Sequence, residues 1–353
     1  MQKEVDYIIV GCGLAGIAFA ETCLQNNKTI FVIDNQSQTS STVAAGIYNP
    51  VILKRFSGLE DAQLQIDLLN VFYKSIEDKL GIQFDFKIPV LRKFFSIEEQ
   101  NNWFLASDKP DLSNFLSLEL VKNKFSSIDS PYDFGAVLQT GFVDTQILLN
   151  NYRDYLLKHD LFAQTTFDYN QLIFESENVF YNGIKAKHIV FAEGFGMHSN
   201  PFFNNLPLDG TKGEILVIKA PKLDLNAILN TSLYILPLGN NFFKVGATYN
   251  WSDKTNVPTE DGKQELLDRL NEILNCDFEI ISHFAGVRPT VKDRKALIGT
   301  HYIHKNMHIL NGMGTRGVML APYLSKILLD NIENGISIHF SINIQRFYNK
   351  MNL

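Results

Sequence analysis

The sequence predicts an α/β protein in which a Rossmann-like domain is interleaved with a mainly antiparallel α+β domain. Strand and helix signals of the βαβ kind occur at both ends and in the middle of the chain, which favours a parallel sheet. Residues 210–250 instead form successive β-rich runs, which favour an antiparallel sheet. The 353 residues, 45% of them apolar, are enough for two packed domains.

The first predicted element is a βαβ unit. Residues 5–10 are a short apolar run before glycines and indicate a buried strand. Residues 14–26 have a helical pattern, and residues 29–33 form a second buried strand. A crossover of about 30 residues is typical of two parallel strands joined by a helix.

Further helices are predicted where apolar residues recur at helical spacing. Residues 35–50, rich in Ser, Thr, Ala and Gly, are expected to form a long loop. Asp144 is a suitable N-cap for one helix, and Pro322 fits the last helix only in its first turn. We expect helices at 60–80, 143–157, 263–275 and from 317 to about 332, and strands at 84–96, 187–191, 279–286 and 307–311.

A glycine-rich turn connects the first strand to the first helix. Gly11 permits the tight turn, Gly13 lets the backbone approach a pyrophosphate, and Gly16 lets helix and strand pack closely. The free N–H groups at the start of the helix, where Leu14 and Ala15 lie, would face the phosphates. The sequence therefore predicts a dinucleotide site here.

The end of the second strand supports the same site. Asp34 follows Gly16 by 18 residues and can accept hydrogen bonds from the ribose hydroxyls of an adenosine. An acid at this position disfavours a 2′-phosphate. The glycine motif and this acid do not by themselves separate NAD from FAD.

Further motifs carry a family resemblance over essentially the whole chain. Together with the first glycines they are similar to the D-amino acid oxidase family of flavoproteins, which includes glycine oxidase and sarcosine oxidase. The last of them also resembles the C-terminal flavin domain of the bifunctional enzyme that builds methylaminomethyl groups on wobble uridines of tRNA. The motifs are residues 40–46 (SSTVAAG), 190–194 (VFAEG), 286–289 (GVRP) with Asp293 and Gly299, and 312–317 (GMGTRG) before Ala321 and Pro322.

The resemblance implies an FAD-binding domain at residues 1–83, 140–205 and 286–353, and a substrate domain at 84–139 and 206–285. It implies non-covalent FAD, because members that attach flavin through cysteine place it near the C-terminal motifs and no Cys follows Cys276. The cofactor contacts that it implies, beyond the first βαβ unit, are Ala45, Gly46, Phe167, Ala192, Gly194, Gly312, Gly314, Thr315, Arg316, Gly317 and Val318.

The resemblance also implies residues for substrate. Arg288 matches the arginine that binds a substrate carboxylate, a role that suits its two-pronged guanidinium. Tyr234 resembles a family tyrosine near the substrate, although a core tyrosine is nearly as good a reading. Tyr48 departs from the family's flavin loop and is expected to reshape the cavity. Lys212 matches a turn at the entrance of the substrate domain, where a structural role is favoured.

Three functions stay open on this sequence. The first is FAD-dependent oxidation of a C–N bond in an amino acid or secondary amine, with hydride transfer to flavin and Arg288 holding the carboxylate. The second is the same chemistry on a wobble-uridine side chain of tRNA. The third is a non-catalytic flavin-binding protein.

Composition limits the partners. The formal net charge of −6 disfavours a broad nucleic-acid-binding face, so a small-molecule substrate is expected over tRNA. Three cysteines without C-x-x-C spacing indicate a reduced, cytoplasmic protein, and no run reaches the roughly 18 apolar residues that span a membrane. The histidines at 301, 304 and 308 are expected in a polar hairpin rather than a metal site. Oligomeric state is left open.

Overall fold

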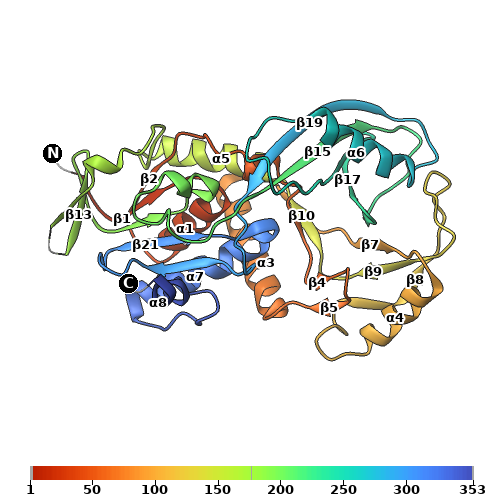
Figure 1. Cartoon of the computed structure of the whole chain (residues 1–353), viewed down its shortest axis with the longest axis horizontal. Coiled ribbons are helices and arrows are strands. Elements are labelled where there is room, and N and C mark those ends of the chain that lie inside the picture. The colour runs from red at the N-terminus through yellow and green to blue at the C-terminus, as the bar shows by residue number, and fades with distance from the viewer. Residues whose placement is uncertain (1–2, 176, 352–353) are drawn as a thin grey trace.

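The computed structural model describes residues 3–175 and 177–351 of the chain. Figure 1 shows two lobes, with the first parallel strands and most helices in one lobe and a large second sheet in the other. The helices are α1 (Leu14–Gln25), α2 (Ser40–Val43), α3 (Ala62–Leu80), α4 (Ile97–Ser107), α5 (Thr145–Lys158), α6 (Glu260–Asn271), α7 (Gly317–Asn334) and α8 (Gln345–Met351).

The sheet of the first lobe has the order β11-β2-β1-β14-β13-β12, and β21 pairs with β14 and β20. Four of its strand pairs are parallel, namely β1 with β2, β1 with β14, β2 with β11 and β14 with β21. Its strands are β1 (Lys3–Val10), β2 (Ile30–Ile33), β11 (Phe162–Ala163), β12 (Ile173–Glu175), β13 (Asn178–Tyr181), β14 (Ile184–Phe191), β20 (Leu297–Thr300) and β21 (Met307–Asn311).

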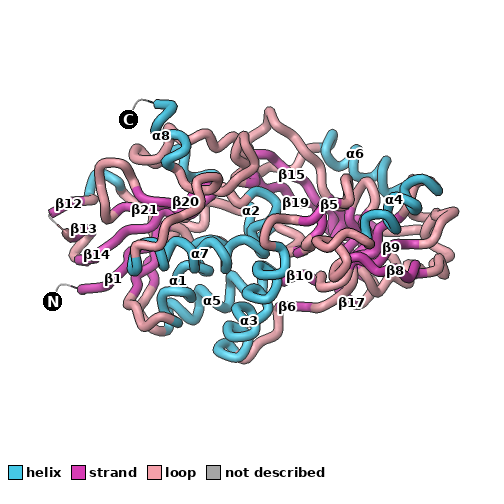
Figure 2. The backbone as a smooth tube through the Cα atoms, turned by 90° about the horizontal axis from the view of Figure 1, so that it is seen from below, coloured by secondary structure: helices cyan, strands magenta, loops and turns pink. Residues whose placement is uncertain are grey.

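Helices cover the two faces of this sheet unequally. Side chains of α1, α3, α5 and α7 pack with Tyr7 and Ile9 into one apolar core, and Figure 2 shows these four helices together on one side. Ile8 and Val10, which point the other way on β1, pack into a second core that includes Tyr348 of α8. Alternate residues of one strand therefore serve two cores, as expected for a sheet buried on both faces.

The sheet of the second lobe has the order β19-β15-β18-β17-β16-β7-β9-β8, and all its pairs except β16 with β7 are antiparallel. Its strands are β7 (Val90–Lys93), β8 (Leu116–Val121), β9 (Phe134–Val137), β15 (Thr211–Lys219), β16 (Ile228–Asn230), β17 (Tyr234–Gly239), β18 (Phe242–Gly246) and β19 (Glu279–Arg288). Two small sheets join β3 (Ile47–Tyr48), β10 (Gly141–Val143) and β6 (Asp85–Phe86), and β4 (Val51–Ile52) with β5 (Ser57–Gly58).

The predicted fold class, a Rossmann-like part with a mainly antiparallel second part, is confirmed. The predicted domain boundaries stay a prediction. One of them, at residue 286, falls inside β19, which runs from Glu279 to Arg288. Among the described residues, no helix is long and apolar enough to cross a membrane. The expected cytoplasmic location stays a prediction as well.

The structure corrects the prediction for Pro322. It lies inside α7, past the first turn that begins at Gly317, where a proline leaves the carbonyl four residues earlier without its helical donor. That carbonyl belongs to Val318, and the hydroxyl of Tyr73 on α3 donates a hydrogen bond to it at 2.8 Å. The neighbouring helix thus replaces the missing N–H, which makes the proline tolerable.

Two other local predictions have clear outcomes. Asp144 caps α5 as expected, because its carboxylate accepts hydrogen bonds from the N–H groups of Gln146 and Ile147 at 3.1 and 3.0 Å. The loop predicted at residues 35–50 instead contains the short helix α2 and strand β3. Both elements pack against long-range neighbours, α2 against β19 and β3 against β10, which local composition does not encode.

Candidate active site

A cavity of about 640 Å³ lies between the two sheets. Segments of the first lobe line it at the glycine-rich turn, the loop after β2, the end of β14 and the turn before α7. Segments of the second lobe close it from the other side. The lining stretches lie within residues 10–15, 33–49, 165–169, 192–199, 228–234, 246–249, 286–289 and 311–318, with Val90, Gly213 and Ile215.

The glycine-rich turn forms one end of the cavity. Gly11 has φ +104°, and a Cβ there would lie 2.4 Å from the carbonyl oxygen of Ala192. Gly16 does not line the cavity, and a Cβ on it would lie 1.9 Å from the carbonyl oxygen of Gly11. Gly13 is the N-cap of α1 without a side-chain cap. The first turn of α1 therefore presents backbone N–H groups to this end.

A buried ion pair supports this turn from behind. The Asp34 carboxylate accepts hydrogen bonds from the N–H groups of Cys12 at 3.0 Å and Gln36 at 2.8 Å. Arg153 of α5 donates from Nη2 to the Cys12 carbonyl at 3.1 Å and lies 3.5 Å from Asp34 Oδ2. Only 8% of Arg153 is exposed. Asp34 thus fixes the glycine-rich turn, and its contact with a ribose stays a prediction.

Sequence reasoning missed Arg153, although a signal was present. Leu149, Tyr152 and Leu156 lie on the buried face of α5, and Arg153 shares that face. An arginine on the apolar face of an amphipathic helix needs a buried acceptor, because an unpaired buried charge is costly.

The end of β14 contributes Ala192, Glu193 and Gly194, all of which line the cavity. The Glu193 carboxylate accepts hydrogen bonds from the hydroxyl of Tyr169 and, at 2.8 Å, from the amide of Asn200. Burial raises the pKa of Glu193 to about 7. Phe167 lines the same region, with its ring stacked 4.2 Å from that of Tyr181.

The loop after α2 brings Ala45 and Gly46 to the cavity. Gly46 has φ +73°, and a Cβ on it would lie 1.8 Å from the carbonyl oxygen of Val143, so only glycine fits. Lys244 of β18 donates to the carbonyl of Ala44 at 3.2 Å, and burial lowers the pKa of its ammonium group. The second lobe therefore holds this loop directly.

The turn before α7 lies opposite. Gly312, Gly314, Thr315, Gly317 and Val318 line the cavity, as the sequence predicts for a cofactor-contacting turn. Gly314 has φ +56°, and the nearest atom to a Cβ there would be 3.9 Å away, so bare backbone borders open space. The side chain of Arg316 is exposed and is not part of the lining, which departs from the expected cofactor contact.

The second lobe places Arg288 at the other end of the cavity. Among the described residues, its guanidinium makes one hydrogen bond, from Nη1 to the carbonyl of Thr248 at 3.3 Å, and meets no carboxylate within ion-pair distance. It lies 4.7 Å from the ring centroid of Tyr249 and against the backbone of Gly213. Tyr234 also lines this end, and burial raises the pKa of its hydroxyl.

Tyr48 requires a correction. It was expected to shape the substrate cavity, but it is fully buried outside the lining residues. Its hydroxyl donates to the Asp85 carboxylate at 2.9 Å, and Gly141 packs against its ring. The alternation of side chains along β3 explains this, since the neighbours Ile47 and Asn49 face the cavity instead.

These residues fit an extended dinucleotide with a flat ring system. Helix α1 offers backbone donors for the pyrophosphate at one end. Gly194 and Gly314 turn backbone without side chains toward the open space, and no protein atom lies within 4 Å of a Cβ built on Gly194. Arg288 adds an unpaired cation at the far end. Fold and site together define a dinucleotide-dependent oxidoreductase, with part of its cavity closed by the second sheet.

Residues 6–331 match the family described as "DAO: FAD dependent oxidoreductase". The chain belongs to this family, and FAD is its cofactor. A glycine oxidase of Bacillus subtilis (strain 168) is 22% identical over 365 residues, which cover 95% of this chain and 94% of that protein.

A second kind of relative is larger. The tRNA 5-methylaminomethyl-2-thiouridine biosynthesis bifunctional protein MnmC of Legionella pneumophila (strain Corby) is 22% identical over 386 residues. The match covers 96% of this chain but 55% of that protein, so the chain spans about half the length of this relative.

Solved structures show the same fold. Glycine oxidase from Bacillus cereus ATCC 14579 superposes with a TM-score of 0.76 at 20% identity, covering 94% of this chain and 96% of that one. Iminodiacetate oxidase from Chelativorans sp. BNC1 gives 0.76 at 16% identity, covering 96% and 99%.

Proposed function

We propose that this enzyme oxidises the C–N bond of a carboxylate-bearing amine, either an amino acid or an N-substituted one. The observation that carries the proposal is the unpaired guanidinium of Arg288 in the cavity wall, with Tyr249 beside it. A buried or half-buried arginine without an acid is suited to bind a carboxylate with two parallel hydrogen bonds. The glycine oxidase relatives and the structurally similar iminodiacetate oxidase are named for substrates that are amines bearing a carboxylate.

In this proposal the chain supplies position rather than acid–base chemistry. Bound FAD, held non-covalently, supplies the two-electron acceptor for the hydride that leaves the carbon next to nitrogen. Arg288 holds the carboxylate and so fixes the distance between the reacting carbon and the cofactor. The exposed side of Tyr249 and the half-buried Tyr234 limit the room beside that carboxylate.

The test is anaerobic mixing of the purified flavoprotein with glycine, sarcosine, iminodiacetate and larger amino acids, followed by flavin absorbance. Bleaching by at least one of them supports the proposal, and no bleaching by any contradicts it. Arg288→Met should raise the half-saturating concentration at least about tenfold, because each lost charge-assisted hydrogen bond is worth about 1.5–3 kcal/mol. Arg269→Met, on the exposed surface of α6, is the matched control.

One observation favours a second candidate, the oxidation of an amine carried by RNA. Three exposed arginines, Arg55, Arg294 and Arg316, lie near one another: partial burial lowers the pKa of Arg316, and the positive charges of Arg294 and Arg55 lower it further. None of them forms an ion pair within the described part of the chain, since nearby Asp293 pairs with Arg346. Arg294 lies 6.0 Å from the ring of Trp251, which is 46% exposed.

This patch borders the cavity, because Arg316 lies between the lining residues Thr315 and Gly317. Arginines beside an exposed aromatic ring suit phosphates and an unstacked base. The bifunctional relatives are named for the biosynthesis of a modified uridine in tRNA, which is a substrate of this kind. Here Arg294→Met should weaken the binding of tRNA, and the affinity should fall steeply with salt. Binding without flavin bleaching by modified tRNA would contradict this candidate.

A further inference from the structure

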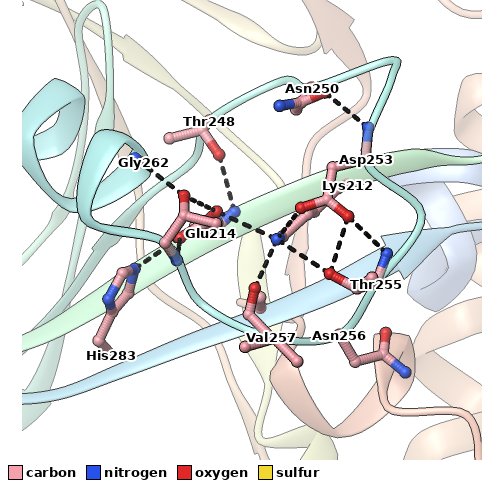
Figure 3. Close-up of polar contacts among 12 residues, drawn as sticks. Lys212, Glu214, Thr248, Asn250, Asp253, Thr255, Asn256, Val257, Gly262 and His283 are labelled. Atoms are coloured by element: carbon pink, nitrogen blue, oxygen red, sulfur yellow. Dashed lines mark hydrogen bonds and ion pairs between the residues drawn. The ribbon is translucent and has the colours of Figure 1, made fainter.

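Lys212 is a lysine with 0% exposure in the second sheet. Its ammonium group donates to the Asp253 carboxylate and the Val257 carbonyl, and lies 3.4 Å from the Thr255 hydroxyl. Figure 3 shows these three contacts, which come from the loop between β18 and α6, meeting at Nζ together with the Glu214 carboxylate of β15, 3.4 Å away. Burial of an ammonium group is costly unless it is fully hydrogen-bonded, so these contacts fix both partners. We call residues 248–259 the tethered segment.

The backbone of Lys212 binds the same segment. Its N–H donates to the Asn250 carbonyl at 2.9 Å, and the Asn250 N–H donates to the Lys212 carbonyl at 3.0 Å. Glu214, two residues along β15, holds both ends, because its N–H donates to the Thr248 hydroxyl and its carboxylate accepts from the Thr259 N–H, each at 2.9 Å. The segment is thus fastened at its start, middle and end.

The tethered segment in turn surrounds Arg288. Thr248 provides the carbonyl that accepts from the guanidinium, and Tyr249 provides the ring 4.7 Å from it. Asn256 accepts from the Val287 N–H at 3.3 Å, which ties the segment to the strand that carries Arg288. The hydrogen-bond acceptor of this guanidinium, Thr248, and the aromatic ring beside it, Tyr249, therefore both belong to the tethered segment.

We propose that Lys212 is a positioning residue for substrate binding, which acts through the tethered segment to hold Arg288 in its carboxylate-binding orientation. This inference rests on the proposed function of Arg288. Asp253 is ionised throughout the useful pH range, because the hydrogen bond from Lys212 lowers its pKa to about 2. The tether therefore includes the ion pair between Lys212 and Asp253.

The test uses two variants that loosen the tether from its two ends. Lys212→Met removes the ammonium group and keeps an apolar stem of similar length. Asp253→Asn removes one charge at the partly exposed end and serves if the first variant does not fold. Lys222→Met is the matched control, since Lys222 is 74% exposed and lies outside the segment.

Two measurements are made on the flavin-loaded proteins. Hydrogen exchange of the peptide covering 248–259 reports the order of the tethered segment. Titration with acetate, followed by the flavin absorbance change, reports carboxylate binding without any turnover. We expect faster exchange in 248–259 and an acetate Kd at least about tenfold higher in both tether variants, with flavin content and the exchange of β1 unchanged. The control should match the parent protein in both measurements.

The outcomes separate this inference from the proposed function. Faster exchange with an unchanged acetate Kd, or unchanged exchange in either folded variant, overturns the positioning role. If the parent protein does not bind acetate, Arg288 is not a carboxylate site and both proposals fail. If acetate binds and depends on Lys212, but no amino acid bleaches the flavin, the positioning role stands and the proposed oxidation fails.

Discussion

The guanidinium of Arg288 lies directly against the backbone of Gly213 on the neighbouring strand. A Cβ built on Gly213 would lie 1.9 Å from Nη2, 2.2 Å from Cζ and 2.3 Å from Nη1. No side chain other than hydrogen leaves room for the guanidinium in this orientation. The strand next to Arg288 therefore makes room for the guanidinium at the proposed carboxylate site, because Gly213 has no side chain.

Gly213→Ala should weaken substrate binding while leaving the fold intact. The backbone of Gly213 is not in the left-handed region, so alanine is not strained there, and the flexible end of Arg288 can move aside. The displaced guanidinium loses its bond to Thr248, a change of about 1 kcal/mol in unfolding free energy. The half-saturating concentration for flavin bleaching by the best amino acid should rise about tenfold.

A double-mutant cycle checks the cause of that effect. If Gly213→Ala acts by moving Arg288, it should add little to the loss already caused by Arg288→Met. Additive losses in the double variant would mean that the added methyl group blocks the cavity by itself.

The sequence predicted those parts of the site that depend on local chain geometry. The turn at Gly11 and Gly13, the acid Asp34 and the cap Asp144 are each specified by residues close in sequence. The parts that were missed or wrong depend on contacts between distant segments. Arg153 reaches a carbonyl 141 positions away, and Pro322 is tolerated because Tyr73 lies 245 positions from the carbonyl that it serves.

Side-chain direction was the other source of error. Tyr48 and Arg316 were placed correctly in sequence, within segments that do line the cavity. Tyr48 is nevertheless buried in the core, and Arg316 is exposed and not among the lining residues, so its cofactor contact stays a prediction. In an irregular segment a motif specifies where the backbone runs, but packing decides which face each residue presents.

Arg153→Met should lower the affinity for FAD. The substitution leaves the Asp34 carboxylate without its nearby cation and the Cys12 carbonyl without its donor, so the glycine-rich turn, where we expect the pyrophosphate, loses its support. We expect the FAD Kd of the apoprotein to rise at least about tenfold, measured by quenching of flavin fluorescence. Lys158→Met, at the exposed end of the same helix, controls for a change of helix stability. Equal FAD affinity in both variants would contradict a supporting role.

Glu193 should make the stability of the apoprotein depend on pH. Its pKa is about 7 in the folded state against an ordinary 4.5, because burial disfavours the charged carboxylate. Between these values the folded protein keeps a proton that the unfolded chain has lost. The contribution of Glu193 to the free energy of unfolding is therefore greatest below pH 4.5. It falls as the pH rises toward 7, by on the order of 3 kcal/mol in total.

The measurement is the free energy of unfolding by urea at several pH values from 5 to 8. Glu193→Gln cannot ionise, so its stability relative to the parent should rise across that range. A constant difference between the two proteins would mean that Glu193 is already charged in the folded state.

Substitutions of the buried Tyr48 and the half-buried Tyr234 should separate a core role from a substrate role. Tyr48→Phe loses the hydrogen bond to Asp85 and should lower the free energy of unfolding by about 1–2 kcal/mol. Its half-saturating concentration for flavin bleaching should equal that of the parent, because Tyr48 is not part of the cavity lining. Tyr234→Phe should change the half-saturating concentration, because Tyr234 lines the cavity at its proposed substrate end. It should leave the free energy of unfolding nearly unchanged, because its hydroxyl makes no hydrogen bond within the described residues that would be lost. A change in substrate saturation for Tyr48→Phe, with none for Tyr234→Phe, would restore the role that the sequence first suggested for Tyr48.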